Sequence, residues 1–290
     1  MKRQSRQRRN RGVRVKLTAR DALLLEAMNR FRLARTRDLL AVAFAGVHPM
    51  TASLRLRRLF DAGYLDVRCG DRSQENIYVL GPLGRRLIEA QGLPVGCVPR
   101  GGTAHHLAIV RAWSDIAEAV ERTPGLSLEL TRADWELRQE FGEASLPLVP
   151  DLFMVLSVTV AGGGEKAVAM AVEVDLGTES LGVLARKIAA YDELRDRKSR
   201  LFGYHNFGLA MVLGNRGRSA AVRHLLEHHW SGWWRLWTAE VGPSAALAEV
   251  ANGTLCVEPA PFTDSRYGNG GSAGVSPAIP RENPLSKGEH

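Results

Sequence analysis

Three carboxylates and one lysine fall where two predicted strands meet the next predicted helix. Asp151 opens one apolar segment, Glu173 and Asp175 close the next, and Lys187 lies on the helix that follows. A turn centred on Gly163 places Asp151 directly across from Asp175, and Glu173 shares that face because side chains alternate along a strand. Clustered carboxylates repel one another unless a cation lies among them, and oxygen ligands favour Mg²⁺ or Mn²⁺. We therefore predict a metal site formed by these three carboxylates.

A second cluster of functional residue types lies on a predicted helix that Pro49 opens. Thr51, Arg55 and Arg58 recur at a spacing of i, i+4 and i+7, which places them opposite the apolar residues of the helix. A side of this kind can enter a major groove. The predicted DNA contacts are Thr51, Ser53, Arg55, Arg57 and Arg58 on this helix, with Arg8, Arg9 and Arg11 near the start of the chain.

The elements that must position this helix follow the order of a winged helix-turn-helix. Thr18 and Asp21 form a capping pair for the first helix, and an alternating segment with a polar tip after Gly63 predicts a two-stranded wing. In such a domain the third helix reads base edges, whereas the wing and the arm contact the DNA backbone. The alternative is a winged helix that binds only proteins, with its arginines in solvent. The predicted helices span residues 18–30, 36–43, 49–62 and 82–91.

The charge of the chain is divided unevenly between its two parts. Residues 1–100 hold 21 Lys and Arg against 8 Asp and Glu, whereas residues 101–290 hold 18 against 23. Eight basic residues and no acidic one fall within residues 1–17, so we expect a disordered arm suited to phosphates. Residues 259–290 are rich in Pro, Gly and Ser and are expected to form a disordered tail.

Composition excludes several other classes of protein. No run of about 18 uncharged apolar residues exists to cross a bilayer, and no apolar segment follows the basic start as in a signal peptide. We therefore expect a cytoplasmic protein without membrane contact. Three cysteines without a CxxC spacing indicate neither a disulfide framework nor a cysteine zinc site. The histidines at 105–106 and 224–229 are interpreted as helix surface, and the tryptophans at 230–237 as the apolar face of a terminal helix.

The second part of the chain has the alternation of helices and strands of an α/β domain. We expect a mixed α/β chain, with a winged helix over residues 18–95 followed by an α/β domain over residues 101–258. The predicted order in the second domain is a helix over 103–122, strands between 126 and 174, a helix over 180–197, a strand over 207–213 and a helix over 217–229.

The carboxylate cluster resembles a variant of the PD-(D/E)XK nuclease pattern, with Pro150-Asp151, then Glu173-Val174-Asp175, then Lys187. Where that pattern has a lysine, this sequence has Asp175, which implies that the role of the lysine is lost or has moved to Lys187. The winged helix followed by VPDLFMV, AVEVDLGTES and KIAAYDEL is similar to the replication-relaxation family of plasmids and integrated mobile elements. This resemblance covers residues 17–237.

The resemblance implies roles for single residues if the nuclease-like site is active. Asp151 and Glu173 would bind the metal with Asp175 as a third ligand, and Lys187 would orient a water or neutralise a phosphate. An additional carboxylate would come from the helix over 103–122, with Glu118, Asp115 and Glu121 as the options. In a retired site no metal is expected, and Glu173 pairs with Lys187 or an arginine.

The leading hypothesis is a protein that binds double-stranded DNA in the replication and transfer of plasmids or conjugative elements. A relaxase or replication protein would be its further partner, and a homodimer is one of the assemblies left open. One alternative is an active metal-dependent endonuclease of the same architecture. The other is a transcriptional repressor whose second domain dimerises or binds an effector.

Overall fold

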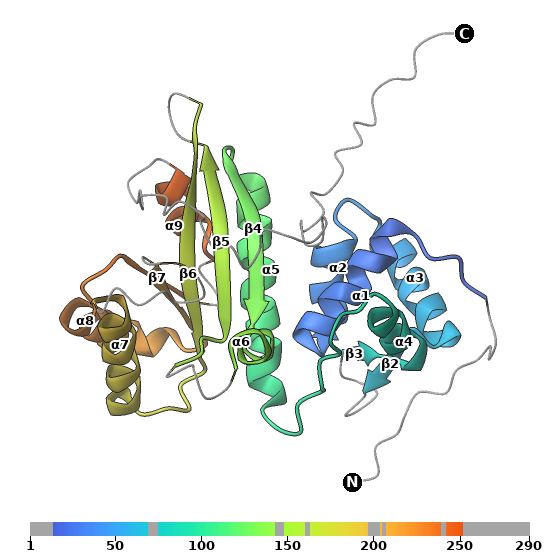
Figure 1. Cartoon of the computed structure of the whole chain (residues 1–290), viewed down its shortest axis with the longest axis horizontal. Helices are drawn as coiled ribbons and strands as arrows, with labels where there is room; N and C mark the ends of the chain where they lie inside the picture. Colours follow the sequence, from blue (N-terminus) through green and yellow to red (C-terminus); the bar gives the residue numbers. More distant parts are fainter. Residues whose placement is uncertain are drawn as a thin grey trace.

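The computed structural model describes residues 14–68, 75–142, 148–159, 163–196, 204, 207–238 and 242–251. Their helices and strands form a mixed α/β structure with one three-stranded and one five-stranded sheet, which confirms the predicted fold class. The N-terminal helices lie beside the larger sheet, with α5 between the two (Figure 1). The predicted contacts Arg8, Arg9 and Arg11 and the predicted tail lie outside the described residues.

The N-terminal part contains the helices and hairpin at the predicted positions. Its small sheet has the order β1-β3-β2, with antiparallel pairing throughout. This order of helices followed by a hairpin is the one on which the winged-helix prediction rests. The elements are α1 (Ala19–Phe31), β1 (Ala34–Arg35), α2 (Thr36–Ala43), α3 (Pro49–Ala62), β2 (Leu65–Arg68), β3 (Ile77–Leu80) and α4 (Pro82–Ala90).

Local signals in the sequence set the boundaries of these helices. Thr18 caps α1 and forms a capping box with Asp21, as predicted. Pro49 begins α3, where its missing N–H costs no hydrogen bond. Gly63 ends α3 at a φ of 91°, a left-handed conformation that favours glycine. The helix α2 spans its predicted residues, and Arg35 occupies its N-cap.

The second part is built on the five-stranded sheet, with the order β4-β5-β6-β7-β8. The first three strands form an antiparallel meander, and β7 and β8 add to it in parallel. The elements are α5 (Thr103–Arg122), β4 (Leu126–Ala133), α6 (Asp134–Phe141), β5 (Leu152–Thr159), β6 (Glu165–Asp175), α7 (Leu181–Asp196), β7 (Gly208–Leu213), the 3₁₀ turn Arg216–Arg218, α8 (Ser219–His229), β8 (Trp234–Thr238) and α9 (Ser244–Ala251).

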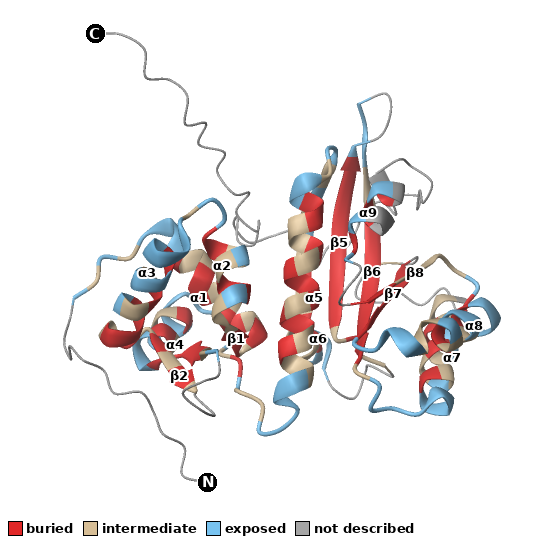
Figure 2. Ribbon diagram, turned by 180° about the vertical axis from the view of Figure 1, so that it is seen from behind, coloured by how far each residue is buried: buried red, intermediate tan, exposed pale blue. Residues whose placement is uncertain are grey.

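Helices cover both faces of this sheet. Alternate residues of β5 and β6 pack with α5 and α9 on one face, whereas the intervening residues pack with α7 and α8 on the other. Both strands are therefore buried along nearly their whole length (Figure 2). Strands buried on both faces read as continuous apolar runs, which is the pattern that identified them in the sequence.

The register of the β5–β6 hairpin differs from the predicted one by two residues. Leu152 pairs with Val172, so Asp151 lies level with Glu173 and not with Asp175. The last described pair of this hairpin is Thr159 with Glu165. A slip of two residues preserves the alternation of faces, and the predicted shared face of Glu173 and Asp175 stands.

Two elements of the second part correct the sequence interpretation. The helix α6 lies within the stretch over 126–174 that was predicted to be rich in strands, and no helix was predicted there. The segment with four tryptophans is not a terminal helix: Trp230 ends α8, and Trp234 and Trp237 lie on the strand β8. Trp230 and Trp237 are buried in two different apolar clusters, and Arg223 stacks over Trp234, so these residues do not form one apolar helix face.

The two parts of the chain meet through polar contacts as well as apolar ones. Arg30, near the end of α1, pairs with Glu136 of α6 at 3.2 Å, and its carbonyl accepts a hydrogen bond from Trp135 Nε1 at 2.7 Å. Arg32 pairs with Asp134 at 2.7 Å. One buried apolar cluster contains residues of α1, α3 and α5 together. None of the helices that the structure describes is long and apolar enough to cross a membrane.

Candidate functional site

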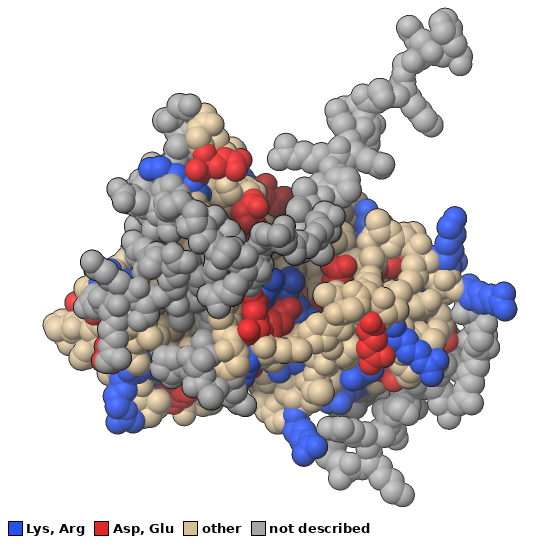
Figure 3. Space-filling model, in the orientation of Figure 1, with Lys and Arg blue, Asp and Glu red and all other residues tan. Residues whose placement is uncertain are grey.

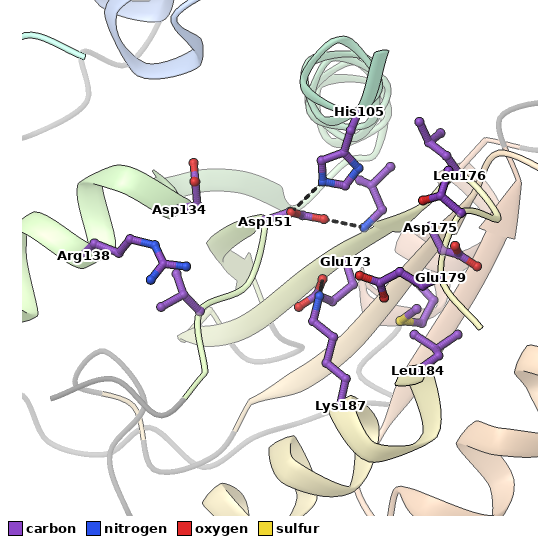
Figure 4. Close-up of a pocket in the computed structure, with 14 residues that line it drawn as sticks. His105, Asp134, Arg138, Asp151, Glu173, Asp175, Leu176, Glu179, Leu184 and Lys187 are labelled. Atoms are coloured by element: carbon purple, nitrogen blue, oxygen red, sulfur yellow. Dashed lines mark hydrogen bonds and ion pairs between the residues drawn. The ribbon is translucent and has the colours of Figure 1, made fainter. Parts of the chain in front are cut away.

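A polar pocket of about 330 Å³ opens beside the ends of β5 and β6. Figure 4 shows His105 reaching from α5 to Asp151, with Lys187 extending from α7 on the opposite side. The pocket brings together all four residues of the predicted site. Its lining includes Asp151, Glu173, Asp175 and Lys187, and adds His105, Asp134, Arg138 and Glu179.

Glu173 is the most deeply buried acid of the pocket, with 3% of its surface exposed. Lys187 Nζ donates to its Oε2 at 2.5 Å, and the Tyr191 hydroxyl donates to its Oε1. Burial, with the nearby charge of Asp151, raises the pKa of Glu173 to about 7 despite these donors. The pKa of Tyr191 is raised well above its usual value by burial and by the same carboxylate.

Lys187 reaches Glu173 because the i, i+4 spacing puts it on the same face of α7 as Tyr191. Burial opposes its charge, but the neighbouring carboxylate of Glu173 outweighs that effect and raises the pKa of Lys187. The predicted pairing of Glu173 with Lys187 in a retired site is the arrangement present here.

Asp151 is held from two sides at the start of β5. His105 Nε2 lies 3.0 Å from its Oδ1, and the backbone N–H of Val174 donates to its Oδ2 at 2.8 Å. The hydrogen bond with Asp151 raises the pKa of His105. Asp151 therefore contacts a protein donor through each carboxylate oxygen and does not simply face water.

Asp175 has partners that differ from those of the other two carboxylates. Its Oδ1 accepts a hydrogen bond from the Gly177 N–H at 2.7 Å, and its Oδ2 lies 3.2 Å from Arg218 Nε. The latter pair is an ion contact without the alignment of a hydrogen bond, since both atoms lack a hydrogen-bond partner in the described structure. Arg218 therefore neutralises the charge of Asp175.

These contacts bear directly on whether the three carboxylates fit a divalent metal. Within the described ranges, no three His, Cys, Asp or Glu side chains are grouped so that they could hold a metal ion. Glu173 has both oxygens engaged by Lys187 and Tyr191, and Asp175 is engaged by Arg218. As placed, the carboxylates do not fit a shared Mg²⁺ or Mn²⁺.

The structure places other predicted site residues outside the pocket. Glu118 is paired with Arg122 on the surface of α5, and Asp115 is paired with Arg111. Neither these two nor Glu121 lines the pocket. The residue of α5 that lines it is His105, which the sequence interpretation assigned to the helix surface.

The sequence held only a weak signal for His105. It lies two residues inside the helix over 103–122, at the end that approaches the start of β5. Its partner Asp151 is 46 residues away, so no local spacing links the two. The histidines His224, His228 and His229 are exposed on α8, as predicted.

The predicted DNA-contacting residues of α3 separate into an exposed set and a paired set. Thr51, Ser53 and Arg58 are exposed. Arg55 instead pairs with Asp21 of α1, and Arg57 pairs with Asp61 at 2.9 Å. On the face seen in Figure 3, basic side chains project from the N-terminal part at the right of the view.

The comparisons with known proteins identify one family. The chain matches the family described as replication-relaxation over residues 25–207, which is more than half of its length. The protein therefore belongs to the replication-relaxation family, which associates it with the replication or relaxation of plasmids and mobile elements. Neither a curated protein nor a solved structure matches it significantly.

Proposed function

We propose that this protein binds duplex DNA through its N-terminal part during the replication or transfer of a mobile element. The α3 helix enters the major groove, while the hairpin and the basic arm contact the DNA backbone. In this proposal the second part is a nuclease-like domain that holds its carboxylates in a closed network and does not cut DNA.

The observation that carries this proposal is the exposed side of α3. The helix packs on α1 and α2 through one side and leaves the other to solvent, farther from α5 and the large sheet than α1 and α2 are (Figure 1). A groove-binding helix must be free along one side in this way. Arg58 is exposed there, and no carboxylate of the described residues pairs with it. Its charge is therefore available to a phosphate or a base edge.

The closed network around Glu173 supports a role without cleavage. A carboxylate that accepts hydrogen bonds from Lys187 and Tyr191 has little capacity left for a metal ion. The domain would then contribute shape, partner contacts or further DNA contacts.

The test measures the affinity of the full chain for a labelled random-sequence duplex pool by fluorescence anisotropy over a range of salt. Arg58→Ala is expected to weaken binding and to make the slope of log affinity against log salt shallower by about one ion. Arg122→Ala is the matched control, because Arg122 is an exposed arginine on α5. Equal loss in both variants would remove α3 from the proposal, and no binding by the parent would overturn the proposal as a whole.

A second candidate function is a metal-dependent endonuclease, favoured by the gathering of Asp151, Glu173 and Lys187 around one pocket. It requires Glu173 to exchange Lys187 and Tyr191 for other partners when DNA binds. Calorimetric titration of Mn²⁺ and Mg²⁺ into the DNA-bound protein, together with incubation with supercoiled plasmid, tests this function. Nicking by the parent that is lost in the Asp151→Ala, Glu173→Ala double variant would establish it.

A further inference from the structure

Two apolar side chains project into solvent from the exposed side of α3. Met50 is 63% exposed and Leu54 is 56% exposed, the two highest values for large apolar residues in the described part of the chain. They are four residues apart and therefore neighbours on the helix surface. Isolated exposed apolar residues are ordinary, but an adjacent pair on a face with no described neighbour suggests a contact surface.

The neighbours of this pair are polar and basic. Thr51, Ser53 and Arg58 are exposed on the same helix. The backbone of Lys16 lies alongside α3, where its carbonyl accepts a hydrogen bond from Arg55 at 2.9 Å. The basic arm therefore enters the folded part beside this helix. A partner that covers Met50 and Leu54 must also accept a positively charged border.

The acidic residues near this side do not alter that charge. Asp21 is buried and neutralised by Arg55, and Asp61 is buried and paired with Arg57. These two aspartates therefore add no exposed negative charge, and the border around Met50 and Leu54 stays positively charged. Duplex DNA is the partner that combines a negatively charged rim with apolar groups at the floor of a groove. Those groups are the thymine methyls of the major groove.

We infer that Met50 and Leu54 read thymine methyl groups, so that the DNA site of this protein contains thymine at fixed positions. This inference rests on the proposed function and adds which bases the helix distinguishes. Both residues lie in the first half of α3, the part of a recognition helix that contacts base edges. Residues at i and i+4 lie about 5–6 Å apart, close to two base-pair steps at about 3.4 Å each. Two thymines within about two base-pair steps are expected.

The experiment begins with selection of bound sequences from a random-sequence duplex pool by the full chain. The recovered consensus is then synthesised with deoxyuridine in place of each thymine in turn, which removes only the 5-methyl group. Burial of one methyl group predicts an affinity loss of about three- to fivefold at each contacted thymine. Leu54→Ala and Met50→Ala are each expected to lose sensitivity to deoxyuridine at one position. Leu93→Ala is the matched control, because Leu93 is 45% exposed but lies beyond α4.

The possible results distinguish a failure of the inference from a failure of the proposed function. A consensus without thymine, or equal affinity for thymine and deoxyuridine duplexes in an Arg58-dependent complex, overturns the inference and leaves DNA binding intact. Retained sensitivity in both Leu54→Ala and Met50→Ala overturns it in the same way. A parent protein that binds no duplex overturns both, and Met50 and Leu54 then belong to a protein interface. Circular dichroism of each variant checks that it is folded.

Discussion

The guanidinium of Arg55 on α3 forms an ion pair with the carboxylate of Asp21 at the start of α1. Arg55 Nε donates to Asp21 Oδ1 at 2.9 Å, and Nη2 contacts Oδ2. Asp21 is 1% exposed and also accepts hydrogen bonds from Thr18 in the capping box. Burial alone would raise the pKa of Asp21, but the donors from Arg55 and Thr18 lower it overall. Arg55 thus joins the first and third helices.

This geometry predicts that Arg55 is primarily a stabilising residue. Arg55→Ala removes the charged partner of a buried carboxylate and is expected to lower the free energy of unfolding by about 2 kcal/mol. Arg58→Ala, on the same helix but exposed, is expected to change it by less than about 0.5 kcal/mol. Urea unfolding followed by circular dichroism measures both. Equal stability of the two variants would show that the Arg55–Asp21 pair contributes nothing.

The contacts between the two parts predict that they unfold together. Arg30 and Glu136 are 24% and 18% exposed and lie 3.2 Å apart across the junction. A double-mutant cycle with Arg30→Ala and Glu136→Ala is expected to give a coupling free energy of about 0.5–1 kcal/mol. Arg122 and Glu118, an exposed pair within α5, supply the reference cycle. Two separate unfolding transitions, or zero coupling across the junction, would contradict this prediction.

The N-terminal elements could be predicted closely because their boundaries depend on local chemistry. The capping box of Thr18 and Asp21, the proline at 49 and the glycine at 63 each act within one turn of chain. The exposure of Arg55 could not be predicted in the same way. Its partner Asp21 lies 34 residues away, and only the packing of α3 on α1 brings the two together.

The candidate site could be predicted in composition but not in detail. Asp151, Glu173 and Lys187 were placed together by the order of strands and helix, and the structure brings them to one pocket. The hairpin register was wrong by two residues because a run of glycines allows several turn centres. His105 was missed because its contact with Asp151 depends on how α5 crosses the sheet, which no short spacing encodes.

The close approach of β7 and the segment before β8 predicts an effect of a single added methyl group. A Cβ on Gly208 would lie 2.0 Å from the Trp233 ring, so Gly208→Ala is expected to lower the free energy of unfolding by about 1–3 kcal/mol through overpacking. Gly182→Ala on α7 meets nothing within 4 Å and is expected to raise it by about 0.5–1 kcal/mol. Thermal unfolding of both variants measures the contrast. A Gly208→Ala protein as stable as the parent would contradict this packing.

The buried carboxylate of Glu173 predicts a dependence of stability on pH. Burial and the charge of Asp151 raise its folded pKa from 4.5 to about 7, so the folded state binds a proton that the unfolded state has already released. The free energy of unfolding should therefore fall as pH rises from about 4.5 to about 7, by at most roughly 3 kcal/mol, and level off above. His105, whose pKa is raised by its hydrogen bond to Asp151, adds a fall in the same direction.

Comparing the parent with Glu173→Gln by urea unfolding from pH 5 to 8 isolates the Glu173 contribution, because His105 is present in both proteins. Glu118→Gln is the control, because it changes an exposed residue of α5 and should leave the dependence of the unfolding free energy on pH as in the parent. If Glu173→Gln also shows the same dependence on pH as the parent, Glu173 is ionised throughout this range.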